Sequence, residues 1–238
     1  MASAFYFRGY EQADRGPVIQ PYLNVFTQTA VGEDLVVRPY VALFHSAHPA
    51  SGNHMVDMSD VMLGVAGTAG RFTLDARYAW YTMNPLMRGD VHELGARASF
   101  DLLATDGDDG RTPLRLRPFA GAYAEVSDEN GTEEVFLNAG IEPFWQLEAA
   151  GHTIGVGLPL EWGLSPDGYY FDRDGSDATF GYFSAALTTS VAIPTSERHG
   201  QWFLNTSVQY LHLEADSVKM MSGGDDAWVG KVGVSFVY

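Results

Sequence analysis

The feature that most constrains this chain is a period-two alternation of apolar and polar residues that recurs through most of its length. In residues 72–81, one set of alternate positions holds Phe, Leu, Ala, Tyr and Trp, and the other set is mostly polar or charged. Successive side chains of a β-strand point to opposite faces of a sheet, so this run predicts a strand with one apolar face. No window of twelve or more residues has the spacing of an amphipathic helix. The chain is therefore predicted to be all-β.

Twelve runs of this kind divide the chain. They cover about 2–9, 18–29, 35–45, 60–65, 72–81, 93–101, 114–125, 135–146, 154–162, 182–191, 202–210 and 228–238. Strands of roughly ten residues cross a bilayer at a tilt near 45°. An even number of antiparallel crossings leaves both chain ends on one side of a membrane. We predict a single domain over residues 1–238, a 12-stranded antiparallel transmembrane β-barrel of the outer-membrane type.

The connections between the predicted strands differ in length from one end to the other. Short connections occupy 32–34, 67–70 and 148–151, and longer ones occupy 46–56, 164–178 and 214–225. Short turns on one rim and long loops on the other are typical of outer-membrane barrels. The connections 104–112 and 194–200 depart from this pattern.

The two faces of the predicted strands suit a barrel with lipid outside. The apolar face is rich in Ala, Val and Leu and has aromatic residues near strand ends, at Tyr78, Trp80, Trp145, Trp162, Trp202, Tyr210, Trp228 and Tyr238. Such rings form the aromatic girdles of a membrane interface. The polar face carries the predicted pore-lining residues Arg38, Asp60, Asp75, Arg77, Glu93, Arg97, Asp101, Arg115, Arg117, Glu125, Glu142, Glu161 and Lys231.

A soluble β-sandwich or a lipocalin-like barrel would also alternate, but with its apolar face enclosed. Long side chains of opposite charge interleaved with glycine favour an interior that is wet or cross-braced by ion pairs. With Arg115 and Arg117 on one predicted strand and Glu142 and Glu161 on the next two, we expect a basic ladder facing an acidic one. A salt-bridge network that only holds the lumen shut is the alternative.

Composition excludes several other classes. The chain has no cysteine, so it contains no disulfide, and its net charge of −16 disfavours a nucleic acid partner. No stretch approaches the 18 apolar residues of a transmembrane helix. The N-terminal residues lack the features of a signal peptide, which indicates a cytoplasmic protein or a mature chain. The strand pattern favours a mature chain in the outer membrane, with the lipid bilayer and lipopolysaccharide as its surroundings.

The C-terminal run ends on an aromatic residue. Val232, Val234, Phe236 and Tyr238 alternate with Gly233, Ser235 and Val237. Outer-membrane proteins commonly end in this way, and the resemblance implies that barrel-assembly machinery binds the strand that ends at Tyr238.

Residues near the N-terminus resemble a known family. Phe7-Arg8-Gly9, followed by Gln12, Asp14, Pro17 and Gln20, is similar to the opening of the TorF-like family of outer-membrane porins. The resemblance covers about twenty residues of the chain. It implies an outer-membrane barrel that acts as a pore, in a family whose substrates are mostly unassigned. Tyr10-Glu11 and Pro21-Tyr22 depart from the family pattern and leave the substrate open. Arg8 beside Asp14 is expected to pin the loop.

Together these observations predict a porin-like channel for passive diffusion of small hydrophilic solutes or ions. A barrel of twelve strands has a backbone radius of roughly 10 to 12 Å, which leaves a narrow channel or a filled lumen. Acidic residues concentrate in the loops and predict a weak cation preference. No cofactor and no enzymatic activity are expected.

Two other functions remain open. One is a structural or adhesive barrel with a plugged lumen. The other is an outer-membrane lipid hydrolase, which needs a serine and a histidine on neighbouring strands near one interface. The histidines His92, His152 and His212 fall near strand ends, but no serine sits beside them in the sequence pattern, and a glycine-flanked nucleophile serine is missing.

Two loops have weak metal-binding patterns. The segment 172–177 places oxygen ligands at alternate positions around a glycine but lacks the terminal Glu of a calcium loop. The loop that contains His45, His48, His54, Met55, Asp57 and Met58 offers ligands for a transition metal. A solvated turn and an ordinary loop are the more common outcomes for such segments.

Overall fold

A computed structural model describes residues 1–13, 17–47, 58–82, 90–104, 114–128, 134–149, 151–195, 198 and 200–238. Almost all of its regular structure is antiparallel β-sheet, as predicted. The strands are β1 (Phe5–Phe7), β2 (Tyr10–Ala13), β3 (Tyr22–Phe26), β4 (Thr29–Val31), β5 (Leu35–Ser46), β6 (Met58–Ala69), β7 (Phe72–Thr82), β8 (Asp90–Phe100), β9 (Leu103–Ala104), β10 (Leu114–Asp128), β11 (Val135–Ala149), β12 (His152–Gly157), β13 (Leu160–Asp167), β14 (Phe180–Ile193), β15 (Gln201–Leu213) and β16 (Asp226–Val237). The described residues contain one helix, α1 (Asp216–Ser222). No helix among these residues is long and apolar enough to cross a membrane.

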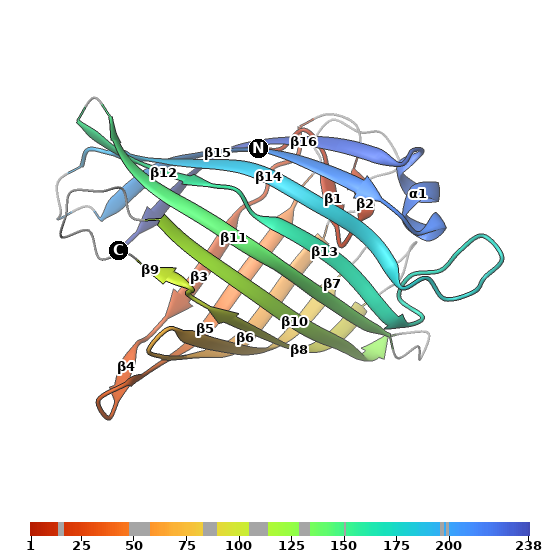
Figure 1. Cartoon of the computed structure of the whole chain (residues 1–238), viewed down its shortest axis with the longest axis horizontal. Helices are drawn as coiled ribbons and strands as arrows, with labels where there is room; N and C mark the ends of the chain where they lie inside the picture. Colours follow the sequence, from red (N-terminus) through yellow and green to blue (C-terminus); the bar gives the residue numbers. More distant parts are fainter. Residues whose placement is uncertain are drawn as a thin grey trace.

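Fourteen of the strands form one large sheet that curls around an interior space, here called the lumen (Figure 1). The order along the sheet is β16-β15-β14-β12-β11-β10-β8-β7-β6-β5-β3, with β4, β9 and β13 continuing the line of β3, β8 and β12. We call the end of the sheet where β5, β7, β10, β13 and β15 terminate the loop end, and the opposite end the turn end. The helix α1 lies at the loop end (Figure 1).

The N-terminal residues link the two edges of this sheet. Ala2 pairs with Lys231 of β16 on one side and with Val18, which precedes β3, on the other. The Met1 carbonyl accepts a hydrogen bond from the Val232 amide, and Ile19 pairs with Ala47 beyond the end of β5. Main-chain hydrogen bonds therefore run from β16 through Met1–Ser3 to the other edge.

Residues 2–9 were predicted to form one strand of the wall. In the structure, only the first of these residues lie in the wall of the sheet. Phe5–Phe7 forms β1 and pairs with β2 in a separate two-stranded sheet. The physical reason is that residues 5–7 are three consecutive aromatic residues, which give no polar face. They pack within the lumen, where Phe5 lies 5.9 Å from Phe44 and Phe7 lies 5.3 Å from Tyr81 between ring centroids.

The turn of this inner hairpin consists of Arg8 and Gly9. Their φ angles are 51° and 84°, and among the described residues Arg8 is the one non-glycine residue with a positive φ. Two successive residues with positive φ define the type I′ turn that two-residue hairpin loops prefer. Arg8 pays a conformational cost in this position, which only surrounding contacts can offset.

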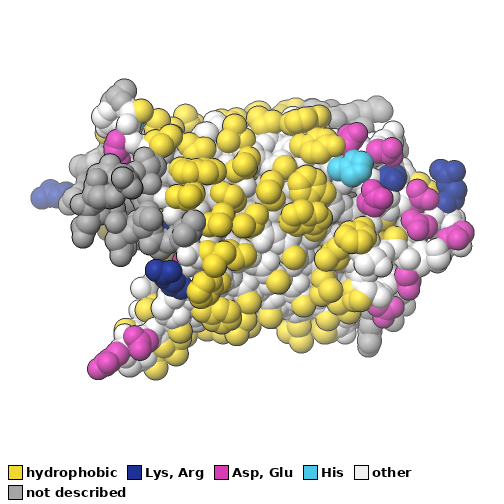
Figure 2. Space-filling model, in the orientation of Figure 1, with side chains coloured by type: hydrophobic (Ala, Val, Ile, Leu, Met, Phe, Trp, Pro, Cys, Tyr) yellow, Lys and Arg dark blue, Asp and Glu magenta, His cyan; other side chains and the backbone are white. Residues whose placement is uncertain are grey.

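The outer face of the large sheet is apolar. Leu74 is 46% exposed and Val208 is 53% exposed, whereas the Glu93 side chain on the opposite face is 0% exposed. On the face in view, Figure 2 shows a broad belt of hydrophobic side chains across the middle, with charged side chains gathered toward the two ends. The predicted orientation, with apolar side chains outward, is confirmed for this sheet.

The predicted aromatic residues fall into two groups near the ends of the sheet. Tyr78, Trp80, Tyr210 and Trp228 lie in the halves of their strands nearer the loop end, and Trp162 does so when β12 and β13 are taken as one line. Trp145, Trp202 and Tyr238 lie toward the turn end. Several of these rings are exposed, and neighbours pair on the outer face, as Tyr210 and Trp228 do with centroids 5.1 Å apart. This distribution is that of two interfacial girdles.

Glycines on the inner face leave room for tyrosine rings. A Cβ atom at Gly163 would overlap the ring of Tyr182, and Gly64 and Gly95 lie in the same way under Tyr40 and Tyr123. The alternation of glycine and large side chains therefore packs the lumen rather than weakening the strands.

We expect Gly163→Ala to lower the free energy of unfolding by about 1–3 kcal/mol, because the buried Tyr182 ring must shift. Gly233→Ala is the matched strand control, since nothing lies within 4 Å of a Cβ at that position. Urea unfolding of the refolded protein, followed by tryptophan fluorescence, measures both. Equal stability of the two variants would contradict this packing.

Candidate functional site

The hairpin tip places the Arg8 side chain in the centre of the lumen near the loop end. Its guanidinium carbon lies 4.3 Å from the ring centroid of Phe136, and between 5.0 and 5.4 Å from those of Phe7, Tyr123 and Tyr169. These rings come from the hairpin, from β10 and β11, and from the connection that follows β13. A guanidinium surrounded by aromatic faces gains cation–π attraction that grows as water is excluded.

Arg8 forms an ion pair with Glu93 of β8. The Arg8 Nη2 donates to Glu93 Oε2 over 2.5 Å, and the two side chains are 7% and 0% exposed. The other carboxylate oxygen, Oε1, accepts a hydrogen bond of 3.0 Å from the Tyr81 hydroxyl and lies 3.8 Å from Arg77 Nη2. The carboxylate is thus fully buried with three partners, which is the arrangement that a buried charge needs.

Residues of the loop end hold the hairpin in place through hydrogen bonds. The Tyr10 hydroxyl donates to the Tyr169 carbonyl over 2.7 Å and lies 3.2 Å from Ser217 Oγ of α1. The Tyr170 hydroxyl donates to the Arg8 carbonyl over 2.9 Å. Burial raises the pKa of the Tyr169 and Tyr170 hydroxyls above their ordinary values, so both stay protonated donors near neutral pH. The hairpin, α1 and this connection therefore form one packed plug.

An apolar core continues around the plug. It contains the buried side chains of Tyr123, Phe136, Tyr170, Leu213 and Val218, with Tyr6 and Tyr10 of the hairpin packed against it. The core of this protein thus lies inside the lumen at the loop end. The turn half of the lumen has no comparable filling among the described residues, and the ends of β3 and β16 are exposed on both faces there.

A cavity of about 520 Å³ lies directly beneath the hairpin. Phe7 and Arg8 contribute from the hairpin, and Arg97, Glu142 and Lys231 are among the wall residues that line it. Two further hollows, of about 380 Å³ and 360 Å³, share Thr188 with it. The lumen is therefore hollow from the plug toward the turn end.

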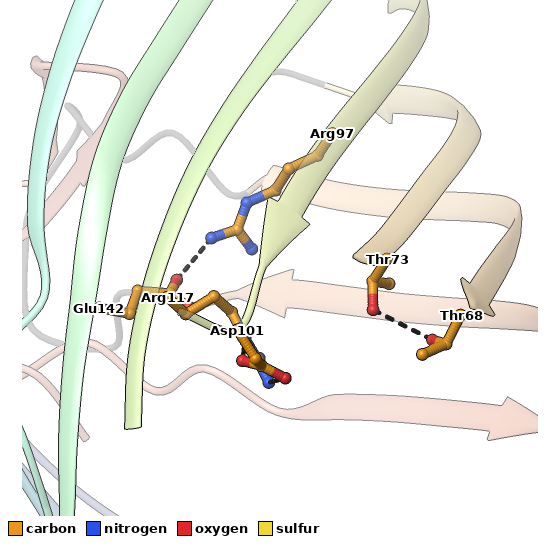
Figure 3. A network of polar contacts seen from close by, with 6 residues as sticks. All are labelled: Thr68, Thr73, Arg97, Asp101, Arg117 and Glu142. Carbon is orange, nitrogen blue, oxygen red and sulfur yellow. Dashed lines mark hydrogen bonds and ion pairs between the residues drawn. The ribbon is translucent and has the colours of Figure 1, made fainter. Parts of the chain in front are cut away.

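The structure brings most of the predicted pore-lining residues into pairs on the inner face. Arg97 donates to Glu142 over 2.5 Å, and Arg117 donates to Asp101 over 2.8 Å (Figure 3). Asp75 accepts from Tyr40, Glu161 accepts from Tyr182, and Arg38 donates to Gln28. Asp60 and Glu125 are buried near the plug, beside Arg77 and Glu93 respectively in the fold. Arg115 and Lys231 have no ion-pair partner within the described part of the chain.

These pairs differ from the expected ladder of bases facing acids. Arg117 is in register with Glu142, yet Arg117 pairs with Asp101 and Glu142 pairs with Arg97. Arg117 faces Asp101 because the register of β8 with β10 continues to these residues, whereas Arg97 of β8 reaches past β10 to Glu142 of β11. Arg8 contacts Glu93, and the expected contact of Arg8 with Asp14 falls outside the described residues.

The histidines singled out as hydrolase candidates have other partners. His92 Nδ1 lies 2.5 Å from the Tyr78 hydroxyl, and His212 lies 2.9 Å from Asp226 and 3.3 Å from Glu214. The structure also contains a histidine–serine pair that the strand pattern did not reveal. His45 Nδ1 lies 2.8 Å from Ser59 Oγ, and these residues are in register on β5 and β6. The run 60–65 started one residue too late to include Ser59.

The two metal-binding patterns gain no support. Within the described residues, no group of three His, Cys, Asp or Glu side chains is placed to hold a metal ion. In the segment 172–177, Asp174 accepts hydrogen bonds from the amide and hydroxyl of Ser176, which hold the pKa of its carboxyl below the usual value. That segment is a hydrogen-bonded turn. His48, His54, Met55 and Asp57 lie outside the described residues.

Sequence reasoning placed Arg8 in a loop and missed its role in the lumen. The aromatic run 5–7 followed by Arg8-Gly9 indicates this position in the sequence. Three consecutive rings break the alternation of a wall strand, and the charged Arg8 in the turn after them does not suit a surface that faces lipid. The partner Glu93 was predicted to face inward, but nothing in the sequence joins it to Arg8, which lies 85 residues away.

No protein-family model matches the chain, and no curated protein matches it. Among solved structures, the chain is similar to the crystal structure of the transport unit of the autotransporter AIDA-I from Escherichia coli. The two chains share 12% sequence identity with a TM-score of 0.44, over 93% of this chain and 82% of that one. A likeness at this level assigns neither a family nor a function to this chain.

Proposed function

We propose that this chain is a 12-stranded outer-membrane β-barrel that acts as a narrow passive channel for small hydrophilic solutes, and that the hairpin β1–β2 closes it at the loop end. The observation that carries the proposal is the inverted distribution of side chains. Apolar residues such as Leu74 and Val208 face outward, while ion pairs and a hollow lie inside. A surface of this kind is stable against lipid and unstable against water.

The twelfth wall strand in this proposal is the N-terminal segment Met1–Ser3. It hydrogen-bonds to β16 on one side and to Val18 on the other. A closed sheet is required in a bilayer, because an open edge leaves backbone groups without partners. Long extracellular loops and short periplasmic turns are usual in such barrels, so we infer that the plug lies on the outer side.

Three further predictions, on the family, the assembly machinery and lipopolysaccharide, are compatible with an outer-membrane channel and stay proposals. Membership of the TorF-like family would assign the same class of pore. Barrel-assembly machinery is the proposed partner of the strand that ends at Tyr238. Lipopolysaccharide is the proposed neighbour of the acidic loops at the outer rim.

Planar-bilayer recording of the refolded full chain tests the proposal. The packed plug predicts a channel that is closed most of the time, with brief conductance steps. If neither the full chain nor a variant without the hairpin conducts, the barrel is a structural one with a permanently plugged lumen. That outcome would remove the channel function and keep the membrane fold.

A second candidate function, a lipid hydrolase, has one observation in its favour. His45 and Ser59 are within hydrogen-bond reach on the outer face of neighbouring strands near the loop end. In that reaction Ser59 Oγ would attack an acyl ester carbonyl while His45 accepts the hydroxyl proton. His45 would return this proton to the alcohol that leaves as the ester C–O bond breaks, and water would then hydrolyse the acyl-enzyme to the fatty acid and free Ser59. No acid or amide orients His45 within the described residues, so the channel remains the better supported function.

The hydrolase candidate predicts that the refolded chain cleaves phospholipid esters and that Ser59→Ala lowers the rate by about 10³-fold or more. Release of fatty acid from mixed micelles measures the rate. Ser190→Ala, on the inner face, is the control and keeps full activity. Equal rates for the two variants, or no release by the full chain, would remove this candidate.

A further inference from the structure

We propose that the lumen contains a binding site for a guanidinium group, which Arg8 of the hairpin fills, and that a small solute carrying a guanidinium group competes with Arg8 for it. The inference rests on the proposed function, because it names the class of solute that the channel admits and the event that opens it. Its physical basis is the origin of the groups around Arg8, the backbone of the turn, the charge of the lumen and the cavity beneath the hairpin.

Most of the groups that surround the Arg8 guanidinium do not belong to the hairpin. We call these groups the cage and define it as the rings of Phe7, Tyr123, Phe136 and Tyr169 with the carboxylate of Glu93. The hairpin contributes Phe7. Tyr123 and Phe136 stack with ring centroids 5.8 Å apart, and Phe136 lies 5.4 Å from Tyr169. These contacts do not depend on the hairpin, so three rings and the carboxylate would remain if it withdrew.

The backbone of the turn gives no reason for an arginine at position 8. Its φ angle is 51°, a conformation that glycine, asparagine and aspartate adopt most readily in hairpin turns. An arginine there carries a conformational cost that its surroundings must offset. Because the Arg8 side chain lies in the cage, the cage offsets this cost through its attraction for the guanidinium.

The cage suits a guanidinium better than an ammonium. A guanidinium is flat, stacks on aromatic faces and pairs with a carboxylate, and it is less strongly hydrated than an ammonium. The Arg8 guanidinium carbon lies 4.3 Å from the Phe136 centroid, while Nη2 donates to Glu93. The Arg8 side chain is 7% exposed, so a cation in this place gives up almost all of its water. The more strongly hydrated ammonium loses more free energy in that step.

The charge of the surrounding lumen also favours a cation. Asp60, Glu93 and Glu125 are buried on the inner wall, with 6%, 0% and 5% exposure. Without Arg8, the described residues of this cluster and of the cavity beneath it contain more acids than bases: Asp60, Glu93, Glu125, Glu142 and Glu161 against Arg77, Arg97 and Lys231. A vacant cage would therefore hold an excess of negative charge at a site that excludes water.

The cavity of about 520 Å³ beneath the hairpin leads to the cage. Arg8 lines it together with the cage residues Phe7, Tyr123 and Phe136. A water molecule takes about 30 Å³ in the liquid, so the cavity has room for a small organic solute. A solute that comes from the turn end would reach the cage from below. Its guanidinium can bind only when Arg8 leaves, which displaces the hairpin and opens the lumen.

Isothermal titration with ethylguanidinium chloride, in uncharged micelles at constant ionic strength, tests the site on the refolded full chain and on Arg8→Gly. Glycine suits the positive φ of the turn, so this variant keeps the hairpin and empties the cage. We expect saturable binding to both proteins. In the full chain the tethered Arg8 competes at an effective concentration on the order of millimolar or above, so its affinity should be about tenfold weaker or more.

Three controls define the site. Ethylammonium chloride, of equal charge, should bind Arg8→Gly about tenfold more weakly or less tightly still. Adding Glu93→Gln to Arg8→Gly removes the carboxylate and should weaken ethylguanidinium binding about tenfold or more. Arg97→Ala is the matched variant, because Arg97 also pairs with a carboxylate and lies over one ring, 4.0 Å from the Phe119 centroid, but is 36% exposed. Its affinity for the probe should equal that of the full chain.

The titrations can overturn the inference in three ways. No saturable binding to Arg8→Gly, or equal binding of ethylammonium, would show that the cage does not select a guanidinium. Binding to Arg8→Gly with none to the full chain would make the cage a seat for the hairpin alone. The measurement needs no conduction, so its failure is distinct from failure of the channel. Binding to the full chain without any conductance would defeat the channel and keep the guanidinium site.

Discussion

Replacing residues 5–15 by the two-residue turn Asn-Gly is expected to convert a mostly closed channel into one with sustained conductance. The replaced segment contains the whole inner hairpin, including Arg8 and the three rings of Phe5–Phe7. Met1–Ser3 and Val18, which pair with each other and with the wall, remain in place. Asn-Gly closes a hairpin between antiparallel segments. The hollow beneath the plug would then open to the loop end.

Time-averaged conductance in planar bilayers measures this change. A variant in which Asn-Gly replaces residues 172–177 is the control, because it shortens the loop end by a similar device and leaves the hairpin seated. We expect its conductance to match that of the full chain. Arg8→Asn adds a milder test: asparagine tolerates positive φ, so the turn persists while the ion pair is lost, and opening becomes more frequent. Identical recordings from all of these variants would show that the hairpin does not close the lumen.

Removing the Glu93 carboxylate is expected to cause the largest loss of stability of any single substitution in the lumen. Glu93→Ala leaves the buried Arg8 guanidinium without its partner and removes an acceptor from Tyr81 and a counter-charge from Arg77. Breaking a buried pair on one side typically costs about 3–5 kcal/mol, because the remaining charge stays desolvated. Urea unfolding of the refolded protein measures the loss.

Removing the other partner of this ion pair is expected to lower the free energy of unfolding by less. In Arg8→Asn, Glu93 keeps Tyr81 and the nearby Arg77, and the turn loses its backbone strain. The double variant Arg8→Asn with Glu93→Ala should lose less stability than the two single variants lose in sum, since neither member of the Arg8–Glu93 pair is then left buried without the other.

The matched control for Glu93 is another ion pair of the lumen. Arg117 and Asp101 are 40% and 28% exposed, so Asp101→Asn is expected to cost less than about 1 kcal/mol. If Asp101→Asn and Glu93→Ala destabilise the protein equally, burial is not what makes the Arg8–Glu93 pair important.

The amino-acid sequence by itself determined the class of structure. Alternation such as that of residues 72–81 is a local property, because each side chain's face follows from its place in the strand. It therefore predicted the strands, the outward position of Leu74 and Val208, and the aromatic residues near the strand ends. The prediction of a wall strand at 2–9 was wrong where three consecutive rings broke the alternation.

Only the tertiary structure decided what happens inside the lumen. Which charges meet depends on register and on the curvature of the sheet, and neither is encoded in the spacing along one strand. Arg117 meets Asp101 rather than Glu142, and Arg8 meets Glu93 across 85 residues of chain. A partner is selected by three-dimensional distance, and folding brings together segments whose order in the sequence carries no record of that contact.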